Sequence, residues 1–229
     1  MAERIVVIGA GGFGRETLDV IEAINADGET LHLVGVVDSG PRQIDLGRLA
    51  ERGIVYLGTE EEWLPGASGD ERFVVAIGSP TVREAVARRL SDAGLRPVTL
   101  IHPRAVVGSQ ARIGDGVVIT SGVQVSTNVS IGDHVHLNPA CIIGHDATLA
   151  DFVSVNPGAI VSGNVVVEGG TLLGAGSVVL QGLTVGAGVT VGAAACVTKD
   201  VAPGATVVGV PAHEAVRADP EGVPSWRLR

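Results

Sequence analysis

A six-residue period of aliphatic positions runs through the chain from Leu100 to Val201. In consecutive blocks of six, the sixth place is mostly Ala or Val, and glycine crowds the third and fourth places. Alternation along an open sheet does not produce a period of six, whereas a short strand followed by a tight turn in every block does. The second place of every block is aliphatic: Ile101, Val107, Ile113, Ile119, Val125, Ile131, Leu137, Ile143, Leu149, Val155, Val161, Val167, Leu173, Val179, Val185, Val191 and Val197.

This period predicts a left-handed parallel β-helix, in which three blocks form one triangular coil. Successive coils are separated by the inter-strand spacing of about 4.8 Å, so residues eighteen apart in the sequence stack on one another. Asn138-Pro139 and Asn156-Pro157 have this separation. We therefore expect two Asn-Pro turns at the same corner of consecutive coils, with the asparagines stacked in a ladder.

The first half of the chain has a different pattern, in which buried strands alternate with amphipathic helices, as in a Rossmann-like α/β domain. A glycine-rich turn, Gly9-Ala10-Gly11-Gly12-Phe13-Gly14, separates the first strand from the first helix. The predicted strands are Ile5 to Ala10, Leu33 to Val37 and Phe73 to Ile77, and the predicted helices are Arg15 to Ala26 and Thr81 to Ala93.

The glycine turn fits G-x-G-x-x-G, a spacing that lets the backbone approach a phosphate at a helix N-terminus. Asp38 follows the second strand, where an acid can accept a hydrogen bond from a ribose or a base. Fewer than a hundred residues precede the first hexad, so one mononucleotide-binding unit is favoured over a full NAD domain. The alternative is a tight turn that binds nothing.

Charge and composition narrow the class of function. A formal charge of -9 argues against nucleic acid as a partner. Neither a signal-peptide pattern nor an apolar run of about 20 residues is present, which favours a cytoplasmic protein with no membrane partner. Cys141 and Cys196 lack metal-ligand spacing, so we interpret them as buried thiols and expect no metal.

His145 and Asp146 place an imidazole and a carboxylate on a turn otherwise made of small residues. A histidine oriented by a carboxylate is suited to remove a proton from an amine or hydroxyl during acyl transfer. Gly163 follows eighteen residues later, leaving bare backbone beside the imidazole, and its N–H is a candidate donor to a thioester carbonyl. The alternative is a solvated turn histidine. We interpret His134, facing a neighbour or solvent, and His136, on an outer face, as structural.

Several motifs together carry a resemblance that covers Ile5 to about Pro211. They are the opening I-x-x-I-G-A-G-G-F-G-R-E, A-I-G-S-P, L-I-H-P-R-A, N-P-A-C-I-I-G-H-D, N-P-G-A-I-V-S-G-N-V and V-V-G-V-P-A. In these motifs the chain resembles the bacterial hexapeptide-repeat acetyltransferases that modify sialic acid or nucleotide-linked amino sugars, a family with an N-terminal nucleotide-binding domain.

The resemblance implies roles for individual residues. His145 is implied as the catalytic base, and Asp146 as the residue that orients it. Residues implied at the acceptor are Asn138, Gly11, Gly12, Phe13, Asp38 and Gly78, and those implied at acetyl-CoA are Gly163, Ala175, Ala193 and Gly209. Phe13 and Ser154 stand where many members have histidine, which leaves open the nucleotide and the contacts of the acceptor and acetyl group.

We therefore expect a Rossmann-like nucleotide-sugar-binding domain over 1–98, a β-helix acetyltransferase domain over 99–212 and a C-terminal tail over 213–229. The predicted activity is acetyl transfer from acetyl-CoA, its co-substrate, to the amine of a nucleotide-linked amino sugar in a homotrimer. One alternative is O-acetylation of a sialic-acid-like hydroxyl. Another is a trimeric metal lyase of the γ-carbonic anhydrase type, for which His134, His136 and His145 are the candidate ligands.

Overall fold

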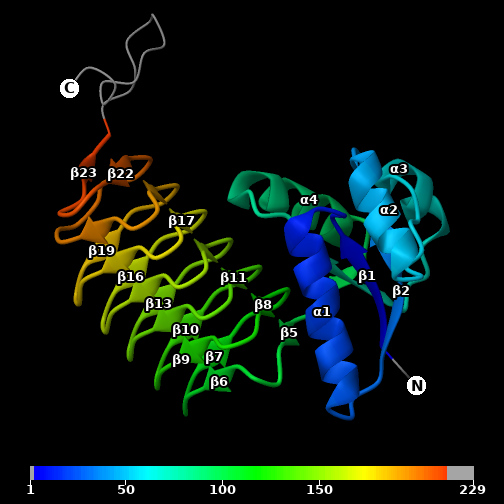
Figure 1. Cartoon of the computed structure of the whole chain (residues 1–229), viewed down its shortest axis with the longest axis horizontal. Helices are drawn as coiled ribbons and strands as arrows, with labels where there is room; N and C mark the ends of the chain where they lie inside the picture. Colours follow the sequence, from blue (N-terminus) through cyan, green and yellow to red (C-terminus); the bar gives the residue numbers. More distant parts are fainter. Residues whose placement is uncertain (1–2, 216–229) are drawn as a thin grey trace, which may run out of the picture.

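The computed structural model describes residues 3–215 and shows an α/β domain followed by a long β-helix (Figure 1). The sheet of the first domain has the order β2-β1-β3-β4, and all of its strand pairs are parallel. The three longer strands are mostly apolar, as expected for a parallel sheet that is covered on both faces, whereas the fourth is a short edge strand. The strands are β1 (Glu3–Ile8), β2 (Leu31–Val37), β3 (Glu71–Val75) and β4 (Arg96–Pro97).

Helices cover both faces of this sheet. α1 (Gly12–Ala26) packs on one face and α4 (Pro80–Asp92) on the other, which gives two separate layers of buried aliphatic side chains. The sequence patterns predicted these two helices, but they did not identify α2 (Gln43–Glu51), α3 (Glu60–Trp63) or the 3-10 turn η1 (Leu64–Gly66). A Thr59-x-x-Glu62 capping box begins α3 and is a sequence signal for that helix.

The β-helix has three faces, each a parallel sheet of two-residue strands. Only the C-terminal end of the first face differs, because β22 has three residues and β23 is antiparallel. The first face contains β5 (Leu100–Ile101), β8 (Val118–Ile119), β11 (His136–Leu137), β14 (Ser154–Val155), β17 (Leu172–Leu173), β20 (Thr190–Val191), β22 (Thr206–Val208) and the antiparallel β23 (His213–Glu214). The second face contains β6 (Val106–Val107), β9 (Gln124–Val125), β12 (Ile142–Ile143), β15 (Ile160–Val161), β18 (Val178–Val179) and β21 (Cys196–Val197). The third contains β7 (Arg112–Ile113), β10 (Ser130–Ile131), β13 (Thr148–Leu149), β16 (Val166–Val167) and β19 (Thr184–Val185).

The register agrees with the predicted eighteen-residue repeat: His136 pairs with Ser154, and Ile142 with Ile160. From Ile119 onward, every second-place aliphatic residue is buried in the axial core. Ile101 and Val107 are 36% and 37% exposed, because they lie in the first coil, with no coil beneath them. The fold class and the period of six are therefore confirmed.

Three corners join the faces, and we number them in chain order. In the coil that contains His145, the first corner is 138–141, between the first and second faces. The second corner is 144–147, between the second and third faces, and the third is 150–153, leading back to the first face. Glycine or another residue with positive φ recurs at these corners, as at Ala140, Asp146 and Phe152.

The α/β domain packs against the first face of the β-helix, beside β5, β8 and β11 (Figure 1). This contact corrects the prediction that His134 faces a neighbour or solvent, and it covers the outer face on which His136 was expected. His136 is 1% exposed because the domain covers its outward-facing strand position. His134 is 6% exposed; its ring stacks on Phe152 with centroids 5.2 Å apart and on Phe73 with centroids 6.1 Å apart. Neither histidine faces solvent.

Within residues 3–215, no helix has the length and apolar character needed to cross a membrane. The predicted C-terminal tail over 213–229 lies outside the described residues from 216 onward, and only its first three residues can be placed. His213 and Glu214 form β23, which pairs with the end of β22 and closes the last coil.

Candidate active site

His145 and Asp146 form an exposed pair at the second corner. Nδ1 of His145 lies 2.7 Å from Oδ2 of Asp146, and the two side chains are 59% and 46% exposed. When Nδ1 carries the proton and donates a hydrogen bond to the carboxylate, Nε2 has a free lone pair and can act as a base. Asp146 has φ +61°, a left-handed conformation that aspartate tolerates better than most residues, and its N–H donates to the Thr127 carbonyl.

Gly163 lies against the imidazole in the next coil. A β-carbon on Gly163 would fall 2.6 Å from Cε1 and 2.7 Å from Nε2 of His145, so only glycine leaves room for the ring in this position. The Gly163 N–H has no backbone acceptor among the described residues, while its carbonyl accepts from Gly182. An unpaired donor beside a base is the arrangement that an acyl-transfer intermediate requires.

The glycine turn has an open part and a packed part. No atom lies within 4 Å of a β-carbon built on Gly11 or Gly12, whereas one on Gly14 would collide with the Gly9 carbonyl oxygen. Gly14 therefore lets α1 approach the strand, and the two open glycines leave room for a ligand. Asp38 holds the turn, because its Oδ2 accepts from the Ala10 N–H at 2.8 Å. Its Oδ1 accepts from the Gly40 N–H at 2.8 Å.

A cavity of about 240 Å³ lies at the carboxyl ends of the strands, between Gly9, Asp38 and Ile77. In the sheet order β2-β1-β3-β4, β2 lies on one side of β1 and β3 lies on the other. The direction of the chain across the sheet therefore reverses at β1. Ligands of open α/β sheets bind at such a switch point. Gly78 borders the same edge, and a β-carbon built on it also meets open space.

The structure separates the remaining predicted residues from His145. Asn138 lies at the first corner, where its Nδ2 donates to the Val155 carbonyl at 3.0 Å and lies 3.4 Å from Oδ1 of Asn156. The asparagine ladder is therefore present. Ala175 and Ala193 are exposed at the first corner of later coils, and Gly209 follows β22. One chain thus does not bring these residues to the corner that carries His145 and Gly163.

Sequence reasoning missed Arg83, a fully buried arginine on α4. Its guanidinium donates to the Ile77 carbonyl at 2.9 Å and to Oγ of Ser154 at 2.9 Å. Arg83 shares the buried stripe of the helix with Val86 and Leu90. A charge within an apolar stripe is the signal that would have identified it.

The histidines proposed as metal ligands are engaged in other contacts. His136 uses both ring nitrogens, one with Arg83 at 3.0 Å and the other with the Val75 carbonyl at 3.0 Å. His145 lies at the second corner, whereas His136 lies on β11 of the first face. Both ring nitrogens of His136 are therefore engaged within the chain, which argues against its role as a metal ligand and against the metal-lyase interpretation.

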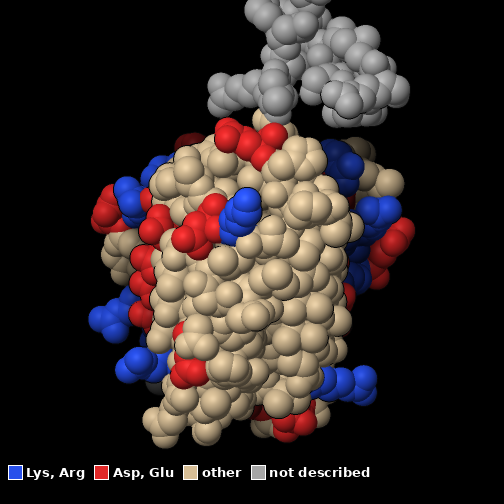
Figure 2. Space-filling view, turned by 90° about the vertical axis from the view of Figure 1, so that its left-hand side faces the viewer, with Lys and Arg blue, Asp and Glu red and all other residues tan. Residues whose placement is uncertain are grey.

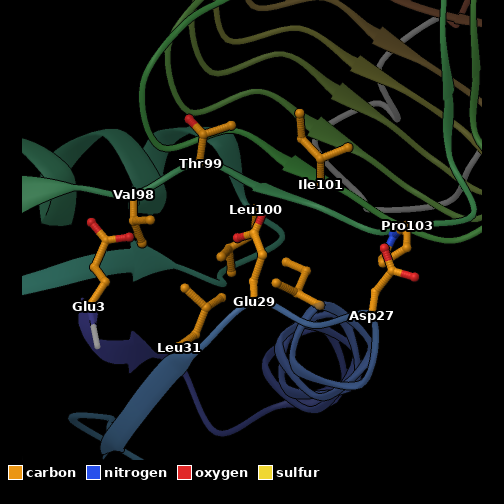
Figure 3. Close-up of a pocket in the computed structure, with 10 residues that line it drawn as sticks. Glu3, Asp27, Glu29, Leu31, Val98, Thr99, Leu100, Ile101 and Pro103 are labelled. Atoms are coloured by element: carbon orange, nitrogen blue, oxygen red, sulfur yellow. The ribbon is translucent and has the colours of Figure 1, made fainter. Parts of the chain in front are cut away.

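A cleft of about 350 Å³ lies between α1 and β5, away from the second corner (Figure 3). Its rim carries the carboxylates of Glu3, Asp27 and Glu29 around an apolar wall that includes Leu31 and Leu100 (Figure 3). Three negative charges repel a diphosphate. This cleft is therefore a poor candidate for the nucleotide site.

The fold and these two sites define a class of protein: a β-helix acyltransferase with an added N-terminal α/β domain. Residues 4–90 match the family described as the PglD N-terminal domain. A GDP-perosamine N-acetyltransferase of Escherichia coli O157:H7 is 35% identical over 142 residues, 61% of each chain. A UDP-N-acetylbacillosamine N-acetyltransferase of Bacillus subtilis strain 168 is 33% identical over 117 residues, 51% of each chain. The chain thus matches 61% and 51% of the length of these two curated relatives.

A solved structure extends the likeness over nearly the whole chain. The acetyltransferase domain of PglB from Neisseria gonorrhoeae FA1090, in complex with acetyl coenzyme A, is 30% identical with a TM-score of 0.81. The alignment covers 93% of this chain and 100% of that one. The chain belongs to the family of hexapeptide-repeat acetyltransferases with a PglD-type N-terminal domain, and the resemblance drawn from its motifs is confirmed.

Proposed function

We propose that this chain is an acetyl-CoA-dependent N-acetyltransferase that acts on the amine of a nucleotide-linked amino sugar. The observation that carries the proposal is the His145–Asp146 pair lying over bare Gly163. The relatives named above support acetyl transfer to an amine, and the open glycine turn of the first domain supports a nucleotide handle.

The mechanism follows from the geometry of the second corner. The amine nitrogen attacks the thioester carbonyl carbon, and Nε2 of His145 takes the proton that the nitrogen loses as the new C–N bond forms. Asp146 keeps Nδ1 protonated and stabilises the imidazolium that results. When the intermediate collapses, the C–S bond breaks and the thiolate of coenzyme A takes up the proton.

Gly163 has a second part in this mechanism. During attack, the carbonyl oxygen of the thioester gains negative charge, and the Gly163 N–H beside the imidazole is placed to donate to it. Coenzyme A contacts are assigned to Gly163, Ala175, Ala193 and Gly209. Acceptor contacts are assigned to Asn138, Gly11, Gly12, Phe13, Asp38 and Gly78.

The separation of the corners supports a homotrimer with shared active sites. The α/β domain covers the first face, whereas His145 lies at the corner opposite that face. An acceptor held by one subunit's glycine turn therefore meets His145 of another subunit. The first places along the second face carry no charge and form a stripe suited to the contact: Val106, Gln124, Ile142, Ile160, Val178 and Cys196.

Exposure supports this assignment: Val106 is 55% and Ile142 is 40% exposed in the single chain. The side of the molecule shown in Figure 2 presents a broad surface with few charged side chains. Exposed apolar side chains along an uncharged face are typical of an interface between subunits.

The activity is tested with a panel of acceptors and acetyl-CoA. UDP-, GDP- and dTDP-linked amino sugars and free sialic acid are compared by release of coenzyme A and by mass spectrometry of the product. We expect one nucleotide-linked amine to be preferred. A sialic acid acetylated faster than every nucleotide-linked amine would contradict the proposal and favour O-acetylation.

The shared site is tested by mixing inactive variants. His145→Ala removes the base, and Gly12→Val obstructs the glycine turn. Mixed trimers of the two variants contain some sites with both intact parts only when those parts come from different subunits. We expect activity at low acceptor concentration to reappear on mixing after subunit exchange. Absence of recovery in trimers shown to be mixed would place the whole site within one chain.

A further inference from the structure

Arg83 links three parts of the molecule at the contact between the domains. Nη1 donates to the Ile77 carbonyl at 2.9 Å and lies 3.0 Å from Nδ1 of His136. Nη2 donates to the Phe152 carbonyl at 2.7 Å and to Oγ of Ser154 at 2.9 Å. The loop after β3, the strand β11 and the third corner of the β-helix are thus all held by one side chain.

These contacts fix the tautomer of His136. A guanidinium only donates hydrogen bonds, so Nδ1 of His136 must accept from Arg83. Nε2 then carries the proton and donates to the Val75 carbonyl at 3.0 Å. Burial, reinforced by the nearby charge of Arg83, lowers the pKa of His136 well below its usual range, in agreement with a neutral ring. The histidine therefore joins β3 to β11 in one orientation.

The same network reaches the glycine turn and the nucleotide crevice, which is the cavity of about 240 Å³ at the end of the sheet. Ile77, whose carbonyl accepts from Arg83, lines the cavity at the end of the sheet. The ring of Phe13 in the glycine turn lies over His136 with centroids 4.4 Å apart. Asn138, assigned to the acceptor sugar, directly follows β11. Arg83 is thus in contact with residues that border the nucleotide crevice and with the strand that leads to Asn138.

The cost of this arrangement indicates a geometric role. Arg83 is 0% exposed, its Nε has no acceptor among the described residues, and burial lowers its pKa to about 9. No carboxylate in residues 3–215 compensates its charge. Apolar side chains of similar volume often stabilise a buried position as well as or better than a charged group. What a guanidinium adds is directed hydrogen bonds, which fix distances that apolar contacts leave loose.

We propose that Arg83 is a positioning residue, which holds the nucleotide-binding loops in register with the β-helix so that the nucleotide delivers the amino sugar to the acetyl-transfer site. This inference rests on the proposed function. Binding of the nucleotide part of the acceptor accelerates the reaction only when it also places the reacting amine at the correct distance and orientation. Loss of Arg83 should therefore reduce the advantage of carrying a nucleotide more than it reduces acetyl transfer itself.

The test measures that advantage directly. For wild type and Arg83→Met, kcat/KM is determined with GDP-perosamine, or the nucleotide-linked amino sugar preferred in the acceptor panel, and with the same amino sugar without its nucleotide. The ratio of the two values is the nucleotide advantage. We expect Arg83→Met to lower the ratio at least tenfold, while kcat/KM for the free sugar and KM for acetyl-CoA stay within about twofold of wild type. Arg83→Lys should restore part of the ratio.

A purely structural role gives a different result, because loosened packing lowers kcat/KM for both acceptors and leaves the ratio unchanged. That outcome in a folded variant would overturn the proposal. If Arg83→Met does not fold, Ser154→Ala removes only the β-helix hydroxyl that Arg83 contacts, and the ratio must still fall. Arg88→Met is the matched control, since Arg88 is an exposed residue of the same helix paired with Glu84.

The two proposals fail in different ways. A wild-type enzyme that prefers the free amino sugar to every nucleotide-linked one refutes the proposed function itself. A wild-type preference for a nucleotide-linked acceptor that persists undiminished in Arg83→Met and Ser154→Ala refutes only the role of Arg83.

Discussion

Two polar clusters of the β-helix lie in the same coil and differ in almost every physical respect. At the second corner, His145 is 59% exposed and contacts a carboxylate from its own turn. On the first face, His136 is 1% exposed and contacts an arginine from the other domain. The cluster at the second corner is exposed to solvent and makes few contacts within the chain. The cluster on the first face, here called the closed cluster, is buried by contacts within the same chain.

This contrast shows how a single repeat serves two purposes. A turn position leaves the side chain in solvent, where it can meet a substrate and exchange protons. A strand position on the covered face places the side chain against the α/β domain, where it fixes the domain's orientation. We therefore expect substitutions at the second corner to change the chemical step, and substitutions at the first face to change acceptor delivery or stability.

The largest effect is expected from His145→Ala. Removing the general base should lower kcat by a factor on the order of 10² to 10⁴, while acetyl-CoA binding measured by calorimetry stays largely intact. Asp146→Asn should cost less, because the imidazole remains. Near-normal turnover by folded His145→Ala would show that this histidine is not the base. A larger loss in Asp146→Asn than in His145→Ala would give the carboxylate another role.

The second effect comes from Gly163→Ala, which tests the open corner without altering any polar group. The new methyl group would fall 2.6 Å from Cε1 of His145, so the imidazole must move. A displacement on the order of 1 Å can lower kcat by about 10², and we expect a loss of that size. Gly169→Ala is the matched control, since it occupies the same place in the next block and its nearest contact would be an ordinary 3.4 Å. Equal kcat in both variants would contradict the assigned geometry.

Much of this arrangement could be predicted from the sequence, because the hexad period translates directly into register. The stacking of Asn138 on Asn156 and of His145 on Gly163 both follow from an eighteen-residue spacing. The burial of His136 does not follow from that spacing, since Ile142 and Thr148, at the same strand position in the same coil, are exposed. Which face the first domain covers depends on long-range packing, which a local pattern does not contain. The place of Arg83 in the buried stripe of α4 is a local signal, but its partners on the β-helix depend on the same long-range packing.

The third effect comes from the first domain and should change acceptor binding instead of the chemical step. Gly12→Val places a branched side chain in open space, so the fold should tolerate it, but it obstructs the approach of a phosphate. We expect KM for the nucleotide-linked acceptor to rise about tenfold, as for loss of one hydrogen bond to a charged group. KM for acetyl-CoA should not change. Asp38→Ala should act in the same direction but more mildly.

Steady-state kinetics with each substrate varied in turn provides the measurement. Gly69→Val is the control, since a β-carbon at Gly69 also meets open space but lies in a different loop. If Gly12→Val and Asp38→Ala fold and leave acceptor KM unchanged, the glycine turn does not hold the nucleotide. A sugar bound only at the β-helix then becomes the better explanation.

The smallest effect is a pH dependence of stability that arises from the closed cluster. Burial lowers the pKa of His136 and of His134 in the folded chain, so the unfolded chain binds more protons below its own histidine pKa of about 6.5. Stability is therefore fully present above that pH and falls as pH drops below it, by at most about 1.4 kcal/mol per pH unit for each histidine. Urea midpoints from pH 7.5 to 5.5 measure this slope. We expect His136→Gln to flatten the slope while lowering stability at pH 7.5. A slope that His136→Gln does not alter would show that the buried ring is not the group being protonated.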